Sequence, residues 1–217
     1  MRVVIAGGHG QIALQLEKVL ADRGDSPVGI VRNPDHVEDL EKAGAEAVVL
    51  DLESTDAETL ADVVHDADAV VFAAGGGPNS GVERKETVDK GAAVLLADAA
   101  EKAGVRRYVM VSAMGLDNAD PDSDDVFQVY LRAKKAADED LRARDLDWTV
   151  VRPGRLTDDP AGGRVQVGHL ARGEVSRADV AAVLAAALVE DATVRTTFDL
   201  LAGHQTIDAA LAGLATH

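Results

Sequence analysis

The chain has 217 residues, and 47% of them are hydrophobic, which is enough to build one well-packed α/β domain. It contains no cysteine, which excludes disulfides, thiolate metal ligands and cysteine nucleophiles, and its six histidines are scattered, so we expect no metal site. The net charge of −16 disfavours binding to nucleic acids and to anionic membranes.

The charged residues are unevenly divided between the two acidic types and between the two common basic types. Aspartate outnumbers glutamate by 26 to 12, and arginine outnumbers lysine by 15 to 7. This composition is typical of proteins from halophiles, in which concentrated salt screens the repulsion, although an ordinary acidic cytoplasmic protein can have it too. No apolar run is long enough to span a membrane, and the charged Arg2 disfavours a signal peptide. We therefore expect a cytoplasmic protein.

Apolar strand-like runs alternate with helical patterns nearly from end to end. The expected strands are 3–6, 28–31, 47–50, 69–73, 107–112, 148–152 and 197–200, and the expected helices are 11–23, 36–43, 56–65, 87–103, 124–144, 177–190 and 207–215. This alternation predicts an α/β fold with a doubly wound parallel sheet of the Rossmann type, in the strand order 3-2-1-4-5-6 with a seventh strand beyond. We expect Ser54 or Thr55 to cap the third helix and Ser176 to cap the sixth.

The first strand runs directly into a glycine-rich turn with the spacing Gly7-x-x-Gly10-x-x-Ala13, and an amphipathic helical pattern follows at once. Small residues let the backbone approach a ligand, and the free amides and dipole at a helix N-terminus favour a pyrophosphate. The order of strand, turn and helix therefore predicts a dinucleotide site. The alternative is a structural turn with incidental glycines.

The ends of the next three strands bear on the choice of cofactor. After the second strand, Arg32 stands where NAD-specific sites carry an acidic residue, and a cation there suits a 2′-phosphate, so NADP(H) is favoured over NAD(H). The alternative is a surface arginine that bonds to Asp35 or caps backbone carbonyl groups. Asp51 and Leu52 follow the third strand and are expected beside adenine, unless Asp51 only opens a helix. The run Ala73-Ala74-Gly75 keeps side chains small beneath a cofactor, as a flexible loop also would.

A second motif, Tyr130-x-x-x-Lys134, places a phenol and an amine on one helix face. The lysine can lower the pKa of the phenol and hold the nicotinamide ribose, and the tyrosine can then pass a proton to a carbonyl oxygen. Ser112, at the end of the fifth strand, can orient that carbonyl. The alternatives are an exposed tyrosine beside a solvated lysine, and a hydroxyl that satisfies only the backbone.

The sixth strand is followed by Pro153, which fixes a turn whose amides would lie by the nicotinamide carboxamide. Arg155, two residues later, faces either an anionic substrate or the acidic surface of the protein itself.

Together these motifs resemble the atypical short-chain dehydrogenase/reductase superfamily, and within it the small NAD(P)-binding, NmrA-like group that includes flavin- and biliverdin-IXβ-reductase-type proteins. The resemblance covers essentially the whole chain and implies one NAD(P)-binding domain over residues 1–217, with a small substrate-side elaboration from about residue 153. It implies cofactor contacts for Gly7, His9, Gly10, Gln11, Ile12, Arg32, Asp51, Leu52, Ala73, Ala74, Gly75, Lys134 and Pro153, and catalytic roles for Ser112, Tyr130 and Lys134. One departure is Ala113, where many extended dehydrogenases have a second serine.

We therefore expect an NADPH-dependent reductase, a monomer or homodimer, that acts on a small carbonyl, quinone or flavin-like acceptor. One alternative is a non-catalytic NADP(H) sensor or assembly protein of the NmrA-like type. Another is a sugar-nucleotide epimerase or dehydratase, which uses the same triad. The sequence disfavours the latter because only about 65 residues follow Arg152, which we expect to form one or two strands and two helices.

Overall fold

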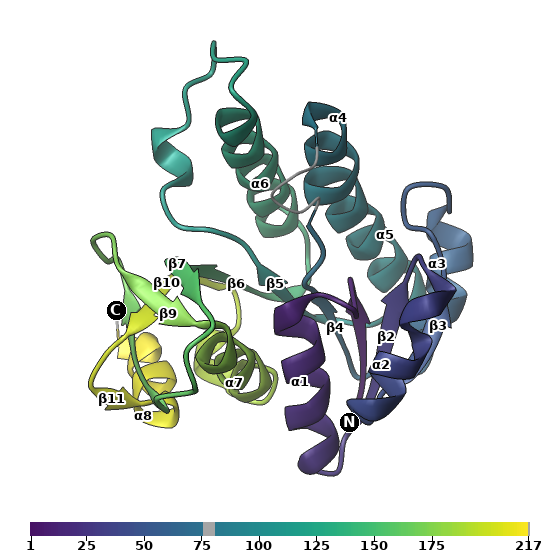
Figure 1. Ribbon diagram of the computed structural model, residues 1–217, viewed down its shortest axis with the longest axis horizontal. Coiled ribbons are helices and arrows are strands. Elements are labelled where there is room, and N and C mark those ends of the chain that lie inside the picture. The colour runs from purple at the N-terminus through teal and green to yellow at the C-terminus, as the bar shows by residue number, and fades with distance from the viewer. Residues whose placement is uncertain (76–80, 217) are drawn as a thin grey trace.

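The computed structural model describes residues 1–75 and 81–216, and its central feature is a nine-stranded sheet with helices on both faces (Figure 1). The strands are β1 (Arg2–Ala6), β2 (Ser26–Val31), β3 (Glu46–Val49), β4 (Ala69–Phe72), β5 (Arg107–Val111), β6 (Asp147–Pro153), β7 (Arg155–Thr157), β8 (Arg164–Gly168), β9 (Glu174–Ser176), β10 (Thr196–Ala202) and β11 (Gln205–Thr206). The helices are α1 (Gln11–Asp22), α2 (Val37–Lys42), α3 (Ala57–Val64), α4 (Val82–Arg84), the π-helix η2 (Lys85–Ala92), α5 (Ala93–Ala103), α6 (Val126–Arg142), α7 (Arg177–Ala187) and α8 (Ile207–Ala212), with four short 3-10 turns between them, η1 (Pro34–His36), η3 (Leu116–Asn118), η4 (Asp191–Thr193) and η5 (Gly213–Thr216).

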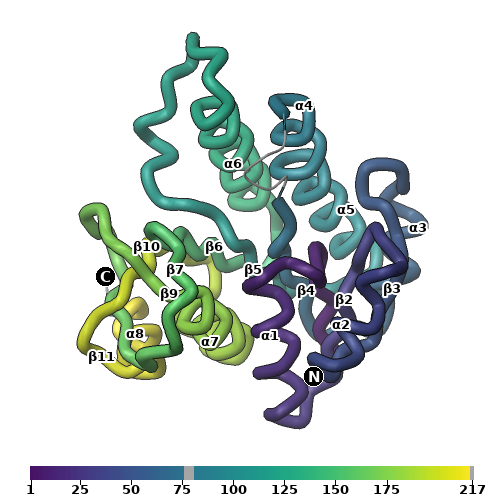
Figure 2. Tube along the Cα trace, in the orientation of Figure 1, coloured from purple at the N-terminus to yellow at the C-terminus, as the bar shows by residue number. Residues whose placement is uncertain are grey.

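The order of strands in the main sheet is β11-β8-β10-β6-β5-β4-β1-β2-β3. The run from β3 to β6 is parallel, which confirms the expected order 3-2-1-4-5-6, and β10 pairs in parallel with β6 as the seventh strand. The order reverses between β1 and β4, and the chain begins there, in the middle of the sheet (Figure 2). In open α/β sheets, ligands bind at the carboxyl ends of the strands at such a switch point.

The core consists of two apolar layers because the parallel strands are buried on both faces. In β1, Val3 and Ile5 pack toward α1 and α7, whereas Val4 and Ala6 pack toward α3 and α5. The same division continues across β4 and β5, which explains why these strands read as continuous apolar runs without alternation.

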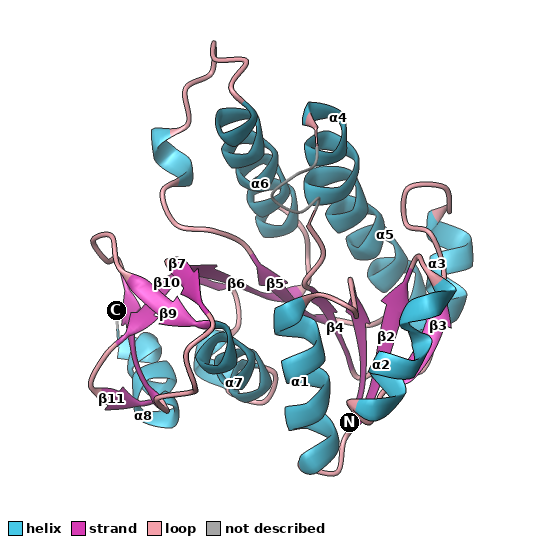
Figure 3. Cartoon of the chain, viewed as in Figure 1, coloured by secondary structure: helices cyan, strands magenta, loops and turns pink. Residues whose placement is uncertain are grey.

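The region after Arg152 differs from the expectation of one or two strands and two helices. In the part of the chain that the structure describes, it holds five strands, β7 to β11, besides α7 and α8 (Figure 3). Strands β8 and β11 extend the main sheet in antiparallel fashion, and β7 pairs with β9 in a small separate sheet. Apart from β10 these strands have between two and five residues, too few to show a period in the sequence.

The helix starts bear out one expected cap and correct another. Ser176 caps α7, because its hydroxyl oxygen accepts a hydrogen bond from the Asp179 amide at 3.0 Å. The cap of α3 is Asp56, which accepts from the Thr59 amide at 2.8 Å, so the expectation of Ser54 or Thr55 was wrong. Asp56 is the cap because it stands one residue nearer the helix than Thr55, where its carboxylate can accept a hydrogen bond from the third amide of the helix. No helix among the described residues is long and apolar enough to cross a membrane.

Candidate coenzyme and active site

The turn between β1 and α1 has no room for side chains. Gly7 has a φ of +85°, and a Cβ built on it would lie 2.6 Å from the Cα of Ala74. A Cβ on Gly10 would lie 3.2 Å from the Gly7 carbonyl oxygen. Gly10 is the N-cap of α1, no side chain caps this helix, and its first turn carries no acidic residue. The first amides of α1 are therefore available to an anion, and the turn fits a pyrophosphate.

Two predicted residues at the start of α1 contribute backbone only. Gln11 is exposed, and the side chain of Ile12 packs against the core; among the described residues, neither lines either of the two cavities discussed below. Their expected role in holding the pyrophosphate therefore depends on their amides.

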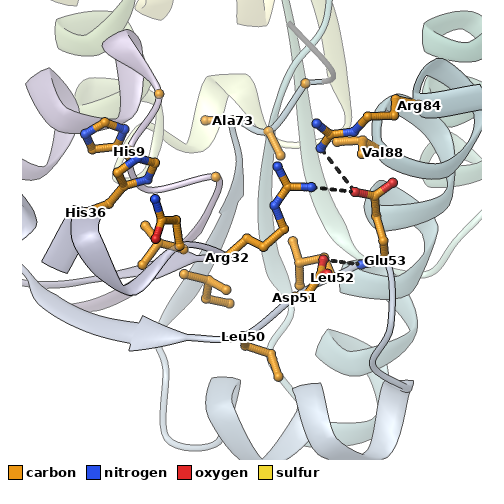
Figure 4. A pocket seen from close by; sticks show the side chains of 17 residues that line it. His9, Arg32, His36, Leu50, Asp51, Leu52, Glu53, Ala73, Arg84 and Val88 are labelled. Atoms are coloured by element: carbon orange, nitrogen blue, oxygen red, sulfur yellow. Dashed lines mark hydrogen bonds and ion pairs between the residues drawn. The ribbon is translucent and has the colours of Figure 1, made fainter. Parts of the chain in front are cut away.

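A cavity of about 360 Å³ opens beside this turn, and we call it the arginine cavity because Arg32 and Arg84 line it (Figure 4). Residues from the ends of β1, β2, β3 and β4 meet here, as the switch point requires. Of the predicted cofactor residues, the cavity is lined by Gly7, His9, Gly10, Arg32, Asp51, Leu52, Ala73, Ala74 and Gly75.

Arg32 does not bond to Asp35 but to Glu53, with 3.2 Å between its Nη1 and the carboxylate Oε2. Arg84 reaches the same oxygen at 3.1 Å, and the Thr87 hydroxyl donates to the other carboxylate oxygen at 2.6 Å. The side chains of Arg32 and Arg84 are 55% and 37% exposed, although the Nε of Arg84 is buried and has no hydrogen-bond partner among the described residues. The sequence analysis missed Glu53, Arg84 and Thr87 because none belongs to a recognisable motif.

Other polar residues of the arginine cavity bond to each other. Asp51 accepts a hydrogen bond from the Glu53 amide at 3.0 Å, so it also shapes the turn after β3. The His9 ring stacks on His36 with 3.5 Å between centroids, and its Nε2 lies 2.9 Å from Asp39. The hydrogen bond with His9 lowers the pKa of Asp39.

A second cavity, of about 700 Å³, lies on the other side of Ala73–Gly75, and we call it the tyrosine cavity. Ser112, Tyr130 and Lys134 all line it, together with Pro153. The structure thus brings the three predicted catalytic residues from β5 and α6 to one place. Gly10 and residues 73–75 line both cavities, so a long ligand can extend from one to the other.

Lys134 is buried, and its ammonium is held from two sides. It donates to the Val111 carbonyl oxygen at 3.1 Å and lies 3.7 Å from Asp89, which is itself 1% exposed. Asp89 also lies 4.0 Å from the buried Lys85. Burial lowers the pKa of Lys134, whereas Asp89 and Asp138 oppose that shift. Lys85 and Asp89 both lie on η2 and were not predicted, although their i, i+4 spacing was visible in the sequence.

Tyr130 keeps its proton more firmly than the sequence led us to expect. Burial raises the pKa of its phenol, and the negative charges of Asp89 and Asp138 raise it further. The net shift is therefore opposite to the lowering expected from Lys134, because burial and the charges of the two carboxylates determine it. A phenol that stays protonated at neutral pH is in the correct state to donate a proton.

The Ser112 hydroxyl lies inside the tyrosine cavity and faces the carboxylate of Asp138. Its Oγ is buried, and no other side chain or backbone group among the described residues forms a hydrogen bond with it. Asp138 faces Ser112 and is paired with Arg152 at 2.9 Å; burial raises its pKa, and both neighbours lower it. A ligand oxygen that accepts a hydrogen bond from Ser112 therefore competes with Asp138 for this hydroxyl.

An exposed aromatic side chain, Phe127, lies at the tyrosine cavity. Arg155, which was the candidate for binding an anionic substrate, is already paired with a carboxylate. Phe127 is 60% exposed and stacks on Tyr130 with 6.1 Å between ring centroids. Lys85 lies 5.2 Å from the centre of the Tyr130 ring. Arg155 bonds to Glu174, which supports the acidic-surface alternative for this arginine.

One short segment forms a wall common to the two cavities. Arg84 and Val88 line the arginine cavity, whereas Lys85 and Asp89 line the tyrosine cavity. All four lie on the continuous helical stretch made by α4 and η2. A π-helical turn is uncommon and often occurs at functional sites.

Comparison with known proteins agrees with this geometry. Residues 7–191 match the model of a family described as NAD(P)H-binding. The chain is 37% identical over 213 residues to YhfK of Bacillus subtilis strain 168, named as an uncharacterized sugar epimerase, with 97% of this chain and 99% of that protein covered.

Two solved structures are also similar over nearly the whole chain. One is a Bacillus halodurans protein provisionally described as an NAD-dependent epimerase/dehydratase, with a TM-score of 0.91, 34% identity, and 98% and 99% of the two chains covered. The other is the oxidoreductase ylbE from Lactococcus lactis, with a TM-score of 0.88, 27% identity, and 100% and 98% covered. The names of these relatives therefore include both an epimerase and an oxidoreductase.

Proposed function

Because this chain belongs to the NAD(P)H-binding family, we propose that it is an NADP(H)-dependent reductase of a small carbonyl, quinone or flavin-like acceptor. One observation carries the proposal. Ser112, Tyr130 and Lys134 line a single cavity that is continuous with the glycine turn through Gly10 and residues 73–75. The glycine turn before α1 would hold the pyrophosphate, the residues of the arginine cavity would hold the adenosine, and those at the mouth of the tyrosine cavity would hold the nicotinamide.

The three side chains have complementary roles in this proposal. The bound coenzyme supplies the hydride that reaches the electrophilic carbon of the acceptor. Ser112 donates its hydroxyl to the acceptor oxygen and orients it. Tyr130 transfers its phenolic proton to that oxygen, and Lys134, fixed by Val111 and Asp89, stabilises the negative charge that the tyrosine acquires.

The preference for NADP(H) rests on Arg32. Its guanidinium is half exposed at the end of β2 and lines the arginine cavity, where the ribose of the adenosine is expected. A planar guanidinium binds a phosphate through two parallel hydrogen bonds, which a ribose hydroxyl does not offer.

The test is NADPH oxidation in the presence of quinones, aldehydes and FMN, with Tyr130→Phe beside the wild type. Loss of the proton donor should lower kcat by about 10²–10⁴-fold and leave NADPH affinity, measured by calorimetry, unchanged. Tyr108, the only other tyrosine, is the matched control, because it donates to the Ala93 carbonyl oxygen in the core. Full turnover by Tyr130→Phe would contradict the assigned role, and no acceptor at all would favour a sensor.

A sugar-nucleotide epimerase is the second candidate, and two relatives carry such a name. The region after Arg152 also holds more strands than expected, which weakens the argument from length. An epimerase returns the hydride to its substrate, so it interconverts two sugars without net consumption of coenzyme. Steady turnover of a nucleotide sugar with constant NADPH absorbance would favour it over the reductase.

A further inference from the structure

We propose that Arg84 selects the adenosine 2′-phosphate together with Arg32, and that Glu53 holds both arginines until this phosphate replaces it. The inference rests on the proposed function in one respect, namely that the arginine cavity takes the adenosine half of the coenzyme. Arg84 would thus be a second residue that determines coenzyme specificity, and it lies in a part of the chain that contains no recognisable motif.

The geometry around Glu53 is that of a small anion site. Arg32 at the end of β2 and Arg84 at the end of α4 are 52 positions apart in sequence, yet both approach the same carboxylate oxygen, at 3.2 and 3.1 Å. Figure 4 shows the two guanidinium groups converging on Glu53 from different elements. The Thr87 hydroxyl completes the cluster on the other carboxylate oxygen. One oxyanion between two guanidinium groups is the arrangement that a phosphate also prefers.

The charges favour replacement of the carboxylate by a phosphate. Arg32, Arg84 and Glu53 sum to +1, in a chain whose net charge is −16. A phosphate monoester carries about −1.5 to −2 at neutral pH, so it neutralises two arginines better than one carboxylate does. The ribose 2′-hydroxyl of NAD(H) carries no charge and leaves Glu53 in place.

Because the cluster is partly exposed to solvent, replacing the Glu53 carboxylate by a phosphate costs little free energy. Arg32, Arg84 and Glu53 are 55%, 37% and 23% exposed, and ion pairs of this kind contribute little to stability. Glu53 can therefore turn toward solvent without leaving a buried charge unpaired. Asp51, the other carboxylate in this cavity, is held by the Glu53 amide and does not bond to either arginine.

Calorimetric titration with NADPH, NADH, 2′,5′-ADP and 5′-AMP tests the proposal. Arg84→Ala should lose roughly tenfold or more in affinity for NADPH and 2′,5′-ADP, as Arg32→Ala should, and keep NADH and 5′-AMP within about twofold. Glu53→Gln should bind NADPH more tightly than the wild type and NADH equally well. Arg142→Ala removes the same charge from the exposed end of α6 and is the control.

The possible results either support the proposal or overturn it. Wild-type affinity of Arg84→Ala for NADPH, or an equal loss for NADPH and NADH, would overturn it, and thermal unfolding would confirm that the variant is folded. Loss of NADH affinity in Glu53→Gln would mean that Glu53 binds the ribose and would also overturn it. If Arg84→Ala behaves as expected but no acceptor is reduced, the inference stands and the reductase fails. No binding of NADPH to the wild type would overturn both.

Discussion

The arginine and tyrosine cavities both contain ion pairs, but they differ in how deeply these are buried. At the arginine cavity, Glu53 shares its carboxylate between two partly exposed arginine side chains. At the tyrosine cavity, Asp89 and Lys134 are 1% and 5% exposed. Replacing one partner of an exposed ion pair costs little free energy. Separating a buried pair costs much more, because it leaves a charge in the interior without a partner. The first arrangement suits recognition of a ligand and the second suits fixed positioning of reacting groups.

The largest effect is expected from Asp89→Ala. This change leaves Lys85 and Lys134 buried without the carboxylate that faces both, and removing one partner of a buried pair costs about 3–5 kcal/mol. Urea unfolding at neutral pH measures the loss. Asp22→Ala is the control, because its pair with Lys18 is 67% exposed on both sides. Equal stability of the two variants would show that the charges in the tyrosine cavity are hydrated or neutral.

An intermediate effect is expected at Glu17, a fully buried residue of α1 beneath the glycine turn. A Cβ on Gly29 would lie 2.4 Å from its carboxylate, and neither oxygen has a hydrogen-bond partner among the described residues. Burial raises its pKa to about 8. The folded state therefore binds a proton that the unfolded state releases above its pKa of 4.5, so stability falls as pH rises from there to about 8.

Glu17→Gln should remove this dependence. Relative to the variant, the wild type should lose more than about 1 kcal/mol in unfolding free energy between pH 6 and pH 8.5. Urea unfolding at both values measures the difference. Glu41→Gln, on the exposed part of α2, should follow the wild type. Parallel curves for wild type and Glu17→Gln would show that this carboxylate is ionised when buried.

The smallest effect is expected from Glu53→Ala on stability. Its two ion pairs are partly exposed, so unfolding free energy should change by no more than about 1 kcal/mol. The same urea experiment as for Asp89→Ala gives the comparison directly. A loss as large as that of Asp89→Ala would mean that Glu53 fixes the fold of this region, and the contrast between the two cavities would disappear.

The sequence was most informative where burial imposes a pattern. Strands β1, β2, β4, β5 and β6 are largely buried, and the turn at Gly7 and Gly10 is tightly packed, so the fold and the phosphate site could both be predicted. The order of the strands also places Ser112 and Tyr130 near each other, since β5 and α6 end and begin at the same edge of the sheet.

The missed features depend on contacts between distant segments or on very short elements. Arg84 reaches Glu53 only because the tertiary fold brings the end of α4 close to the turn after β3, and Lys134 faces Asp89 only because η2 packs against α6. No local pattern encodes these distances. The pKa of Tyr130 follows from the same packing, because two carboxylates and burial together outweigh the nearby lysine. Strands β7, β9 and β11 are too short for their few side chains to show a period.

The wall formed by α4 and η2 has a thermodynamic consequence. Arg84 and Lys85 are adjacent in the chain but line different cavities. A ligand that moves this wall at one end changes the free energy of binding at the other end, and the change is reciprocal by linkage. Affinity for the acceptor should then be a function of which coenzyme is bound, so cooperativity between two ligands can arise within a single chain.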